Sequence, residues 1–298
     1  MTDTAPTAAP TNKLGVHALV WVGDTSPESV ETAVKQTAAA GYDILEFSLH
    51  DSVNLDQRAT RELLEANGLG TVCSRGLAKD ADVSSEDPAV VARGQQLLQD
   101  SLEVTAGIGG TILTGALYSA FGKAPGPLSK AGRDNVVGVL KEFAAEAAKV
   151  GVTLGLEVCN RYETNVVNTA RDALRLADDI GSDNVMIHLD SYHMNIEEKD
   201  FASPIIEVGD RLGYVHIGEN DRGYLGSGHL DFPALFEALA TIDYRGAATF
   251  ESFSSAVLSP GLSNDLAIWR NLWDDGFDLA THAREFMAEG LAAPTTGR

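Results

Sequence analysis

Short apolar runs alternate with longer amphipathic segments along the chain. The runs are apolar on both faces, as expected of parallel strands that helices cover. The predicted strands span 14–22, 43–49, 70–76, 111–117, 153–159, 184–190, 213–219 and 247–253. The segments between them have helical spacing and recognisable ends, and glycine follows most of them, where a positive φ can end a helix. The predicted helices span 26–41, 56–67, 88–106, 129–150, 169–180, 204–211, 232–240 and 278–291.

Eight strand-then-helix units in succession predict a single (β/α)8 TIM barrel. A doubly wound open sheet is the alternative, but it usually has a glycine-rich phosphate-binding turn after its first strand. The turn here reads WVGDTSPES and lacks the G-x-G-x-x-G spacing. We therefore expect a disordered N-terminal tail over 1–12, a barrel catalytic domain over 13–292 and a flexible C-terminus over 293–298.

The acidic balance of the chain argues against several classes of partner. Its 298 residues include 43 acidic and 22 basic side chains, which gives a formal net charge of −21. Nucleic acids and anionic membranes bind basic surfaces, so we expect neither as a partner. No apolar run approaches the roughly 18 residues of a membrane span, and the N-terminus does not resemble a signal peptide. Cys73 and Cys159 each lie in a predicted strand, which indicates reduced core residues of a cytoplasmic protein.

Strands five to eight each end with a residue that can bind a metal ion. These residues are Glu157, Asp190, His216 and Glu251. Taken singly, Asp190 could cap a turn, His216 could be a core histidine and each glutamate could pair with an arginine. Four such residues on consecutive strands of a barrel meet at one mouth, and buried carboxylates are costly unless they are paired or metal-bound. Three carboxylates and one imidazole predict a site for Mn²⁺, Mg²⁺ or Co²⁺.

The segments after these strand ends are polar and predict loops that contact a ligand. Glu163, His193 and Arg222 follow the metal-site candidates by three to six positions and are candidate substrate-binding residues. The glycine-rich segment 223–228 predicts a mobile flap over a polar ligand.

Strands one to four carry fewer charged side chains. His17 and Trp21 share a face by strand alternation, and we interpret them as a wall against a sugar carbon chain. Simple barrel packing is an equal alternative for Trp21. Glu46 lies in the middle of a strand, where it could form a buried salt bridge, and we assign it no role. His188 lies deeper in the barrel and is interpreted as structural.

The motifs around these residues belong together. The stretches are LGLEVCNRYETNVVNTA, NVMIHLDSYHMNIEE, GYVHIGENDRGYLGSG and FESF, with GVHALVW at the first strand and GALYS after the fourth. The chain resembles the ketose 3-epimerase family, a group of sugar phosphate isomerase/epimerase-like barrels named for D-tagatose, D-allulose (psicose) and L-ribulose. The combination of E-V-x-N-R-[FY]-E, L-D-x-[FY]-H-M-N-I-E-E and H-x-G-E-x-x-R is specific for that family.

The resemblance implies roles for individual residues. Its metal ligands fall on Glu157, Asp190, His216 and Glu251, and its two catalytic glutamates on Glu157 and Glu251. Its substrate-binding residues fall on Glu163, His193, Arg222 and Phe253. His17 departs from the aromatic residue of the D-ketohexose enzymes, and Ala120-Phe121 departs from a tryptophan found in many members. Both departures lie where we expect the far end of the sugar, so His17 is a further substrate-binding candidate.

The implied activity is metal-dependent epimerisation of free ketoses at C3, such as D-fructose/D-allulose, D-tagatose/D-sorbose and L-ribulose/L-xylulose. One divalent cation per subunit would polarise the carbonyl, and two glutamates on opposite faces of C3 would act as base and acid through a cis-enediolate. We expect no organic cofactor. The alternatives are an aldose–ketose or hydroxypyruvate-type isomerase, a metal-dependent abasic-site endonuclease, and a non-catalytic sugar-binding protein. The endonuclease would need early-strand histidines that the sequence lacks after strands three and four.

The connection 254–277 is too apolar for a free loop. We expect it to expose Leu258, Leu262, Trp269, Leu272 and Trp273. Exposed apolar patches usually mark interfaces, so we predict a homodimer or homotetramer.

Overall fold

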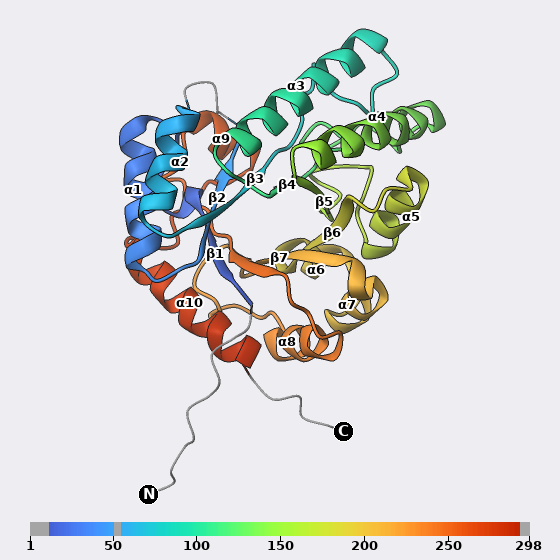
Figure 1. Ribbon diagram of the computed structural model, residues 1–298. Helices are drawn as coiled ribbons and strands as arrows, with labels where there is room; N and C mark the ends of the chain where they lie inside the picture. Colours follow the sequence, from blue (N-terminus) through green and yellow to red (C-terminus); the bar gives the residue numbers. More distant parts are fainter. Residues whose placement is uncertain (1–11, 51–54, 293–298) are drawn as a thin grey trace, which may run out of the picture.

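The computed structural model describes residues 12–50 and 55–292, and it has eight parallel strands closed into a barrel with helices around it (Figure 1). The strands follow one another around the barrel in chain order, and β8 pairs with β1. They are β1 Leu14–His17, β2 Ile44–Ser48, β3 Gly70–Ser74, β4 Ile112–Thr114, β5 Thr153–Glu157, β6 Val185–Asp190, β7 Leu212–Ile217 and β8 Ala247–Phe250. The predicted (β/α)8 barrel is confirmed.

The outer helices begin and end where the sequence supplies caps. They are α1 Pro27–Ala39, α2 Gln57–Ala66, α3 Pro88–Gly107, α4 Lys130–Lys149, α5 Ala170–Ile180, α7 Ala202–Val208, α8 Phe232–Thr241 and α10 Gly276–Ala292. Helix α5 illustrates the local logic, because Thr169 and Asp172 form a capping box at its start and Gly181 ends it with a φ of 64°. Its buried face, which includes Leu176 and Ile180, packs toward the strands.

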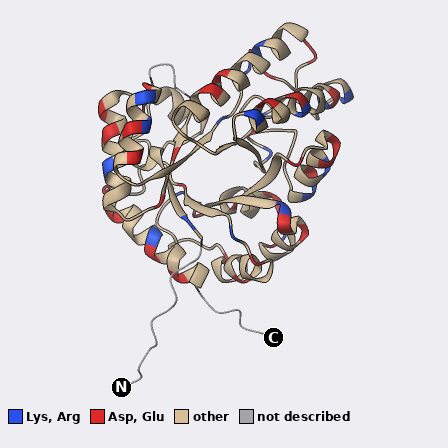
Figure 2. Ribbon diagram, in the orientation of Figure 1, with Lys and Arg blue, Asp and Glu red and all other residues tan. Residues whose placement is uncertain are grey.

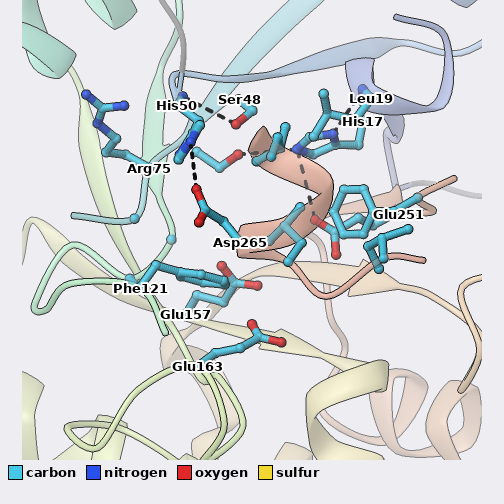
Figure 3. Close-up of a pocket in the computed structure, with 18 of the residues that line it drawn as sticks. His17, Leu19, Ser48, His50, Arg75, Phe121, Glu157, Glu163, Glu251 and Asp265 are labelled. Carbon is cyan, nitrogen blue, oxygen red and sulfur yellow. Dashed lines mark hydrogen bonds and ion pairs between the residues drawn. The ribbon is translucent and has the colours of Figure 1, made fainter. Parts of the chain in front are cut away.

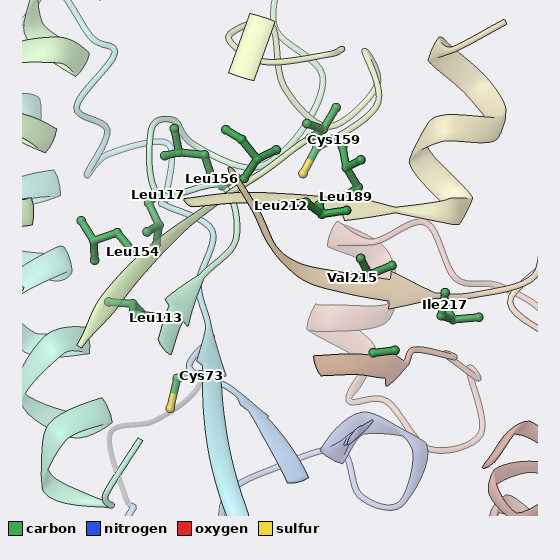
Figure 4. Close-up of a cluster of buried hydrophobic side chains, with 14 of the residues drawn as sticks. Cys73, Leu113, Leu117, Leu154, Leu156, Cys159, Leu189, Leu212, Val215 and Ile217 are labelled. Atoms are coloured by element: carbon green, nitrogen blue, oxygen red, sulfur yellow. The ribbon is translucent and has the colours of Figure 1, made fainter. Parts of the chain in front are cut away.

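Alternate strand residues face the helices or the barrel interior. Leu154 and Leu156 of β5 belong to the apolar core between strands and helices (Figure 4). Inside the barrel, Ile44, Val72 and Tyr214 form a separate buried cluster near the N-terminal ends of the strands. The polar interior side chains come later along the strands, toward the C-terminal end where barrel enzymes have their active sites.

The strand register brings the predicted site residues next to one another. Asp190 is the parallel partner of His216, and His216 is the partner of Thr249, two residues before Glu251. On the other side of the barrel, His17 is the partner of Glu46. Neighbouring strands therefore present these side chains at nearly the same height.

Two predictions about the connections were wrong. Strand β1 ends at His17, and a 3-10 helix over Ala18–Val20 follows at once, so Trp21 does not share a strand face with His17. The indole N–H of Trp21 instead donates a hydrogen bond of 3.0 Å to Thr37 Oγ1 of α1. The polar segment after β6 is also not a loop, because it forms helix α6 Ser191–Glu197.

The ends of the chain lie largely outside the described residues. Asn12, assigned to the tail from sequence, is buried, and its side-chain amide donates to the carbonyls of Tyr244 and Gly246 at 2.9 Å each. Residues 1–11 and 293–298 are not described, so their predicted disorder stays a prediction.

The acidic side chains are spread over the outer helices (Figure 2). In the described ranges, none of the helices is long and apolar enough to cross a membrane.

Candidate active site

A cavity of about 310 Å³ opens at the C-terminal ends of the strands, a size typical of small-molecule sites. It is lined by eight of the nine residues predicted to form the site: His17, Glu157, Glu163, His193, His216, Arg222, Glu251 and Phe253. Figure 3 shows Glu157 and Glu163 on one side of the pocket, with His17 and Glu251 on the other. The ninth residue, Asp190, is fully buried beside His216 and Arg222. The structure thus brings the whole predicted set together.

Three carboxylates surround one imidazole nitrogen. His216 Nδ1 lies 3.5 Å from Glu251 Oε1, 3.7 Å from Glu157 Oε1 and 3.9 Å from Asp190 Oδ2. This nitrogen is buried and has no hydrogen-bond partner among the described residues. Its other ring nitrogen, Nε2, is 2.8 Å from Glu46 Oε2. A buried ring nitrogen without a partner, facing three carboxylate oxygens, fits a divalent cation with oxygen and nitrogen ligands.

The three carboxyl groups differ in their protonation equilibria. Burial raises the pKa of Glu251 to about 8, with the charges of Asp190 and Glu157 adding to that rise against the opposing effect of Arg222 and His216. Burial alone would also raise the pKa of Asp190, but Arg222, His193 and His216 bring it below its usual range. The pKa of Glu157 is lowered by its histidine neighbours in the same way. Glu251 is therefore the carboxyl group of this cluster whose ionisation is opposed, and a cation bound beside it would favour its charged form.

Arg222 is held rigidly against this cluster. Its guanidinium lies 2.6 Å from Glu251 Oε2 and 3.3 Å from Asp190 Oδ2, and it stacks 3.9 Å above the ring of Tyr192. Its backbone has a φ of 64°, a left-handed conformation that non-glycine residues rarely adopt. The Ser252 hydroxyl donates to the Arg222 carbonyl and holds that conformation.

His193 points one ring nitrogen into the pocket. Its Nδ1 accepts from the backbone N–H of Asn160 at 3.2 Å and lies 2.9 Å from the Asn160 side-chain amide. The ring proton therefore sits on Nε2, which is 3.7 Å from Glu157, Glu163 and Asp190 alike. The Asn160 amide also donates to Glu163 Oε1 at 2.8 Å. Asn160 organises this wall, although sequence reasoning gave it no role beyond a polar loop.

The wall from the first half of the barrel is built around His17. Its Nδ1 accepts from the Leu19 N–H at 3.2 Å, so Nε2 carries the proton and lies 3.4 Å from Ser74 Oγ. Burial lowers the pKa of His17 to about 4, against the raising effect of Glu46, so the ring is neutral at pH 7. The ring of Phe253 meets it edge-on, with centroids 5.7 Å apart. Trp21 is not among the lining residues.

Helix α9 Pro260–Asp265 and the residues after it cover the pocket, which sequence reasoning missed. The contacts come from Leu262, Asp265, Leu266 and Ile268. Leu258, Leu262 and Trp273, predicted to be exposed, are buried, Leu272 is partly buried, and Trp269 is 73% exposed. The apolar character of 254–277 therefore reflects packing over the pocket more than a free surface. The glycine-rich segment 223–228 does not line the pocket, and the Gly226 N–H is bound to Glu219 Oε2 at 2.9 Å.

Cys73 and Cys159 are both buried and unpaired within the described part of the chain, as predicted. Burial raises the pKa of the Cys73 thiol to about 12, which keeps it protonated and unreactive.

Comparisons with known proteins identify the family of the chain. Residues 34–280 match the family described as xylose isomerase-like TIM barrel. The chain is 48% identical to an L-ribulose 3-epimerase of Methylomonas sp. (strain DH-1), over 92% of this chain and 96% of that protein. It is 46% identical to a ketose 3-epimerase of Arthrobacter globiformis, over 95% of this chain and 98% of that protein. A crystal structure of the D-allulose 3-epimerase from Methylomonas sp. in complex with D-allulose superposes with a TM-score of 0.91 at 47% identity, covering 94% of this chain and 97% of that one.

The chain belongs to the xylose isomerase-like TIM barrel family, and within that family to the ketose 3-epimerases. It is an isomerase that acts on carbohydrates. This sets aside the non-catalytic sugar-binding protein and the endonuclease.

Proposed function

We propose that the chain, over residues 13–292, is a divalent-metal-dependent enzyme that inverts C3 of free ketoses. The observation that carries this proposal is His216 Nδ1, buried without a hydrogen-bond partner in the described residues and facing Glu157, Asp190 and Glu251 at 3.5–3.9 Å. These four residues would hold the cation. When bound, it would polarise the ketose carbonyl and stabilise negative charge on the neighbouring oxygens.

Glu157 and Glu251 are proposed as the proton-transfer pair. Inverting C3 requires removing its proton on one face and returning a proton on the other, through a cis-enediolate. Two carboxylates that reach the pocket from β5 and from the end of β8 can do this as base and acid, and they exchange roles in the reverse direction.

His193 and Arg222 would orient the reacting end of the sugar. The His193 Nε2–H and the Arg222 guanidinium are donors that face into the cavity, suited to the oxygens on C1 and C2. Glu163, fixed by Asn160, would accept from a hydroxyl at the C1 end. His17 and Phe253 would contact the rest of the carbon chain, where hydroxyl configuration distinguishes one ketose from another.

The names of the relatives indicate the substrate class. They include L-ribulose 3-epimerases and D-psicose 3-epimerases, and one related structure contains D-allulose. We propose that this chain interconverts D-fructose with D-allulose, D-tagatose with D-sorbose, and L-ribulose with L-xylulose. Mn²⁺, Mg²⁺ and Co²⁺ are the proposed ions, with no organic cofactor.

The assembly is proposed to be a cytoplasmic homodimer or homotetramer. Trp269 and Phe277 remain exposed near the last connection, 73% and 38% respectively, and they support an interface there. Light scattering that finds only a 31.5 kDa particle at micromolar concentration would contradict it.

A ketose panel tests the reaction and the metal together. Chelator-treated protein should be inactive and less heat-stable, and Mn²⁺, Mg²⁺ or Co²⁺ should restore both properties. With metal, each ketose should give its C3 epimer. An aldose product would instead favour the isomerase alternative, and full activity in chelator would defeat the metal assignment.

A further inference from the structure

Glu46 is a carboxylate buried in the middle of β2 that the proposed reaction does not use. It is fully buried inside the barrel, below the pocket. One oxygen, Oε2, accepts from the Tyr214 hydroxyl at 2.6 Å and lies 2.8 Å from His216 Nε2. The other, Oε1, is 3.7 Å from His17 Nε2 and has no hydrogen-bond partner in the described residues.

An apolar side chain would fill this position at lower cost. Ile44, on the same face of β2, packs in the interior apolar cluster with Val72. Taking a carboxylate out of water costs several kcal/mol, and replacing a buried ion pair with apolar residues is often neutral or stabilising. Packing alone therefore does not account for Glu46, and its contact with His216 becomes the feature to explain.

The contact with Glu46 settles which nitrogen of His216 carries the proton. An ionised carboxylate has no proton to donate and can only accept hydrogen bonds, so His216 Nε2 must be the donor. In the neutral ring, Nδ1 is then left with its lone pair, and this is the atom that faces Glu157, Asp190 and Glu251. The opposite tautomer would point a proton at the place where a cation would bind.

The same oxygen is itself held in place. The Tyr214 hydroxyl that donates to Glu46 also lies 2.5 Å from Thr249 Oγ1. Tyr214 and His216 are two residues apart on β7, and Thr249 is the strand partner of His216 on β8. Tyr214 on β7, with Thr249 on β8 behind it, thus holds one oxygen of the β2 carboxylate beside the His216 ring.

We propose that Glu46 is a positioning residue, which fixes the tautomer and the ring orientation of His216 so that its Nδ1 lone pair is directed at the cation site. The inference rests on the proposed metal site. Groups that hold the far nitrogen of a metal-binding histidine typically contribute 10–100-fold to metal affinity.

Direct binding measurements test this without relying on turnover. Free Mn²⁺, followed by its electron paramagnetic resonance signal, gives the dissociation constant of wild type, Glu46→Gln and Tyr214→Phe. Glu46→Gln preserves shape but removes the charge that enforces the tautomer, so Mn²⁺ should bind about 10–100-fold more weakly. Tyr214→Phe is the matched control, because it removes a hydrogen bond to the same oxygen while leaving the Glu46–His216 contact. Its Mn²⁺ affinity should fall much less than that of Glu46→Gln, even where its melting temperature falls.

The outcomes separate the two proposals. If wild type does not bind Mn²⁺, the proposed metal site fails. If wild type binds Mn²⁺ and Glu46→Gln binds it equally well, or Tyr214→Phe weakens it as much, the role of Glu46 is overturned. If a variant does not fold, the tautomer of His216 can still be determined by NMR in the wild-type protein. Long-range ¹H–¹⁵N spectra of the Mg²⁺-loaded, histidine-labelled protein should show the proton of His216 on Nε2, and a proton on Nδ1 would refute the inference.

Discussion

The two halves of the barrel present different chemistry at the same pocket. In the half made by β5–β8, Glu157, Asp190, His216 and Glu251 stand within a few ångströms of one another, with Arg222 against them. In the half made by β1–β4, the lining groups nearest the strand ends are neutral and form what we call the neutral wall: His17, Ser48, Ser74 and Ala116. Arg75 and Lys79, which follow β3, also line the pocket and bring positive charge to this half. The charged half is suited to binding a cation and moving a proton. The neutral wall is suited to recognising the shape and hydroxyl pattern of a sugar.

This division follows from the cost of burying charge. A cluster of carboxylates at a closed barrel mouth is tolerable only where cations or imidazoles compensate it. Each member therefore depends on its neighbours, and a single change should propagate through the set. The neutral side chains of the other wall depend less on their neighbours for charge compensation. Single changes there should therefore alter which ketose the enzyme prefers and leave the proton transfer intact.

The largest effect should come from the charged half. Glu157→Gln and Glu251→Gln each remove one proposed proton transfer and one metal oxygen, so turnover should fall by at least about 10²–10⁴-fold. Steady-state kinetics at saturating metal measure this effect. Glu142→Gln, an exposed change on α4, is the control and should be silent. Near-normal turnover in either pocket variant would remove that glutamate from the mechanism.

The charged half was also the half that sequence could predict. Its four residues end consecutive strands, and because neighbouring parallel strands end at one edge, position in the chain translates directly into position in space. The fold was predictable for the same reason, since strands, helices and caps are local patterns. The domain limits and the role of each site residue stay proposals.

The residues that sequence reasoning missed depend on contacts across the barrel. Glu46 on β2 contacts His216 on β7, although 170 positions separate them in the chain, and no local sequence pattern indicates that contact. Asn160 acts by holding His193, 33 positions away. Trp21 was misplaced because β1 gives way to a 3-10 helix right after His17, which ended the strand alternation on which the prediction depended.

A second test compares the stability of the neutral wall at two pH values. His17 has a pKa lowered by burial to about 4, so above pH 6.5 it is neutral in both folded and unfolded chains and costs nothing. As the pH falls below 6.5, the unfolded chain takes up a proton that the folded chain refuses, and stability is lost. When the pH is lowered from 7 to 5, the free energy of unfolding of wild type should therefore fall by about 2 kcal/mol more than that of His17→Phe.

Urea denaturation of the metal-free proteins at the two pH values gives this difference. His229→Asn, at an exposed histidine, should follow wild type. Parallel curves for wild type and His17→Phe would mean that His17 is not held neutral in the folded protein.

The smallest effect concerns substrate choice. His17→Phe replaces the Nε2–H donor beside Ser74 with an apolar ring, without touching a proposed metal ligand. The ratio of kcat/KM values for two ketoses that differ beyond C3 should change by about tenfold. Mn²⁺ affinity should be retained. If the variant lost all ketoses equally and also lost metal, the separation between the two halves would be wrong.

The central claim is that two carboxylates exchange the proton on C3, and deuterium labelling tests it most directly. The enzyme, loaded with Mn²⁺, is incubated with D-fructose in D₂O, and the D-allulose formed early in the reaction is isolated and examined by NMR. Because removal and return of the proton use different glutamates, the product should carry deuterium at C3 and at no other carbon. Unlabelled C3, or label at C1, would contradict the two-glutamate mechanism.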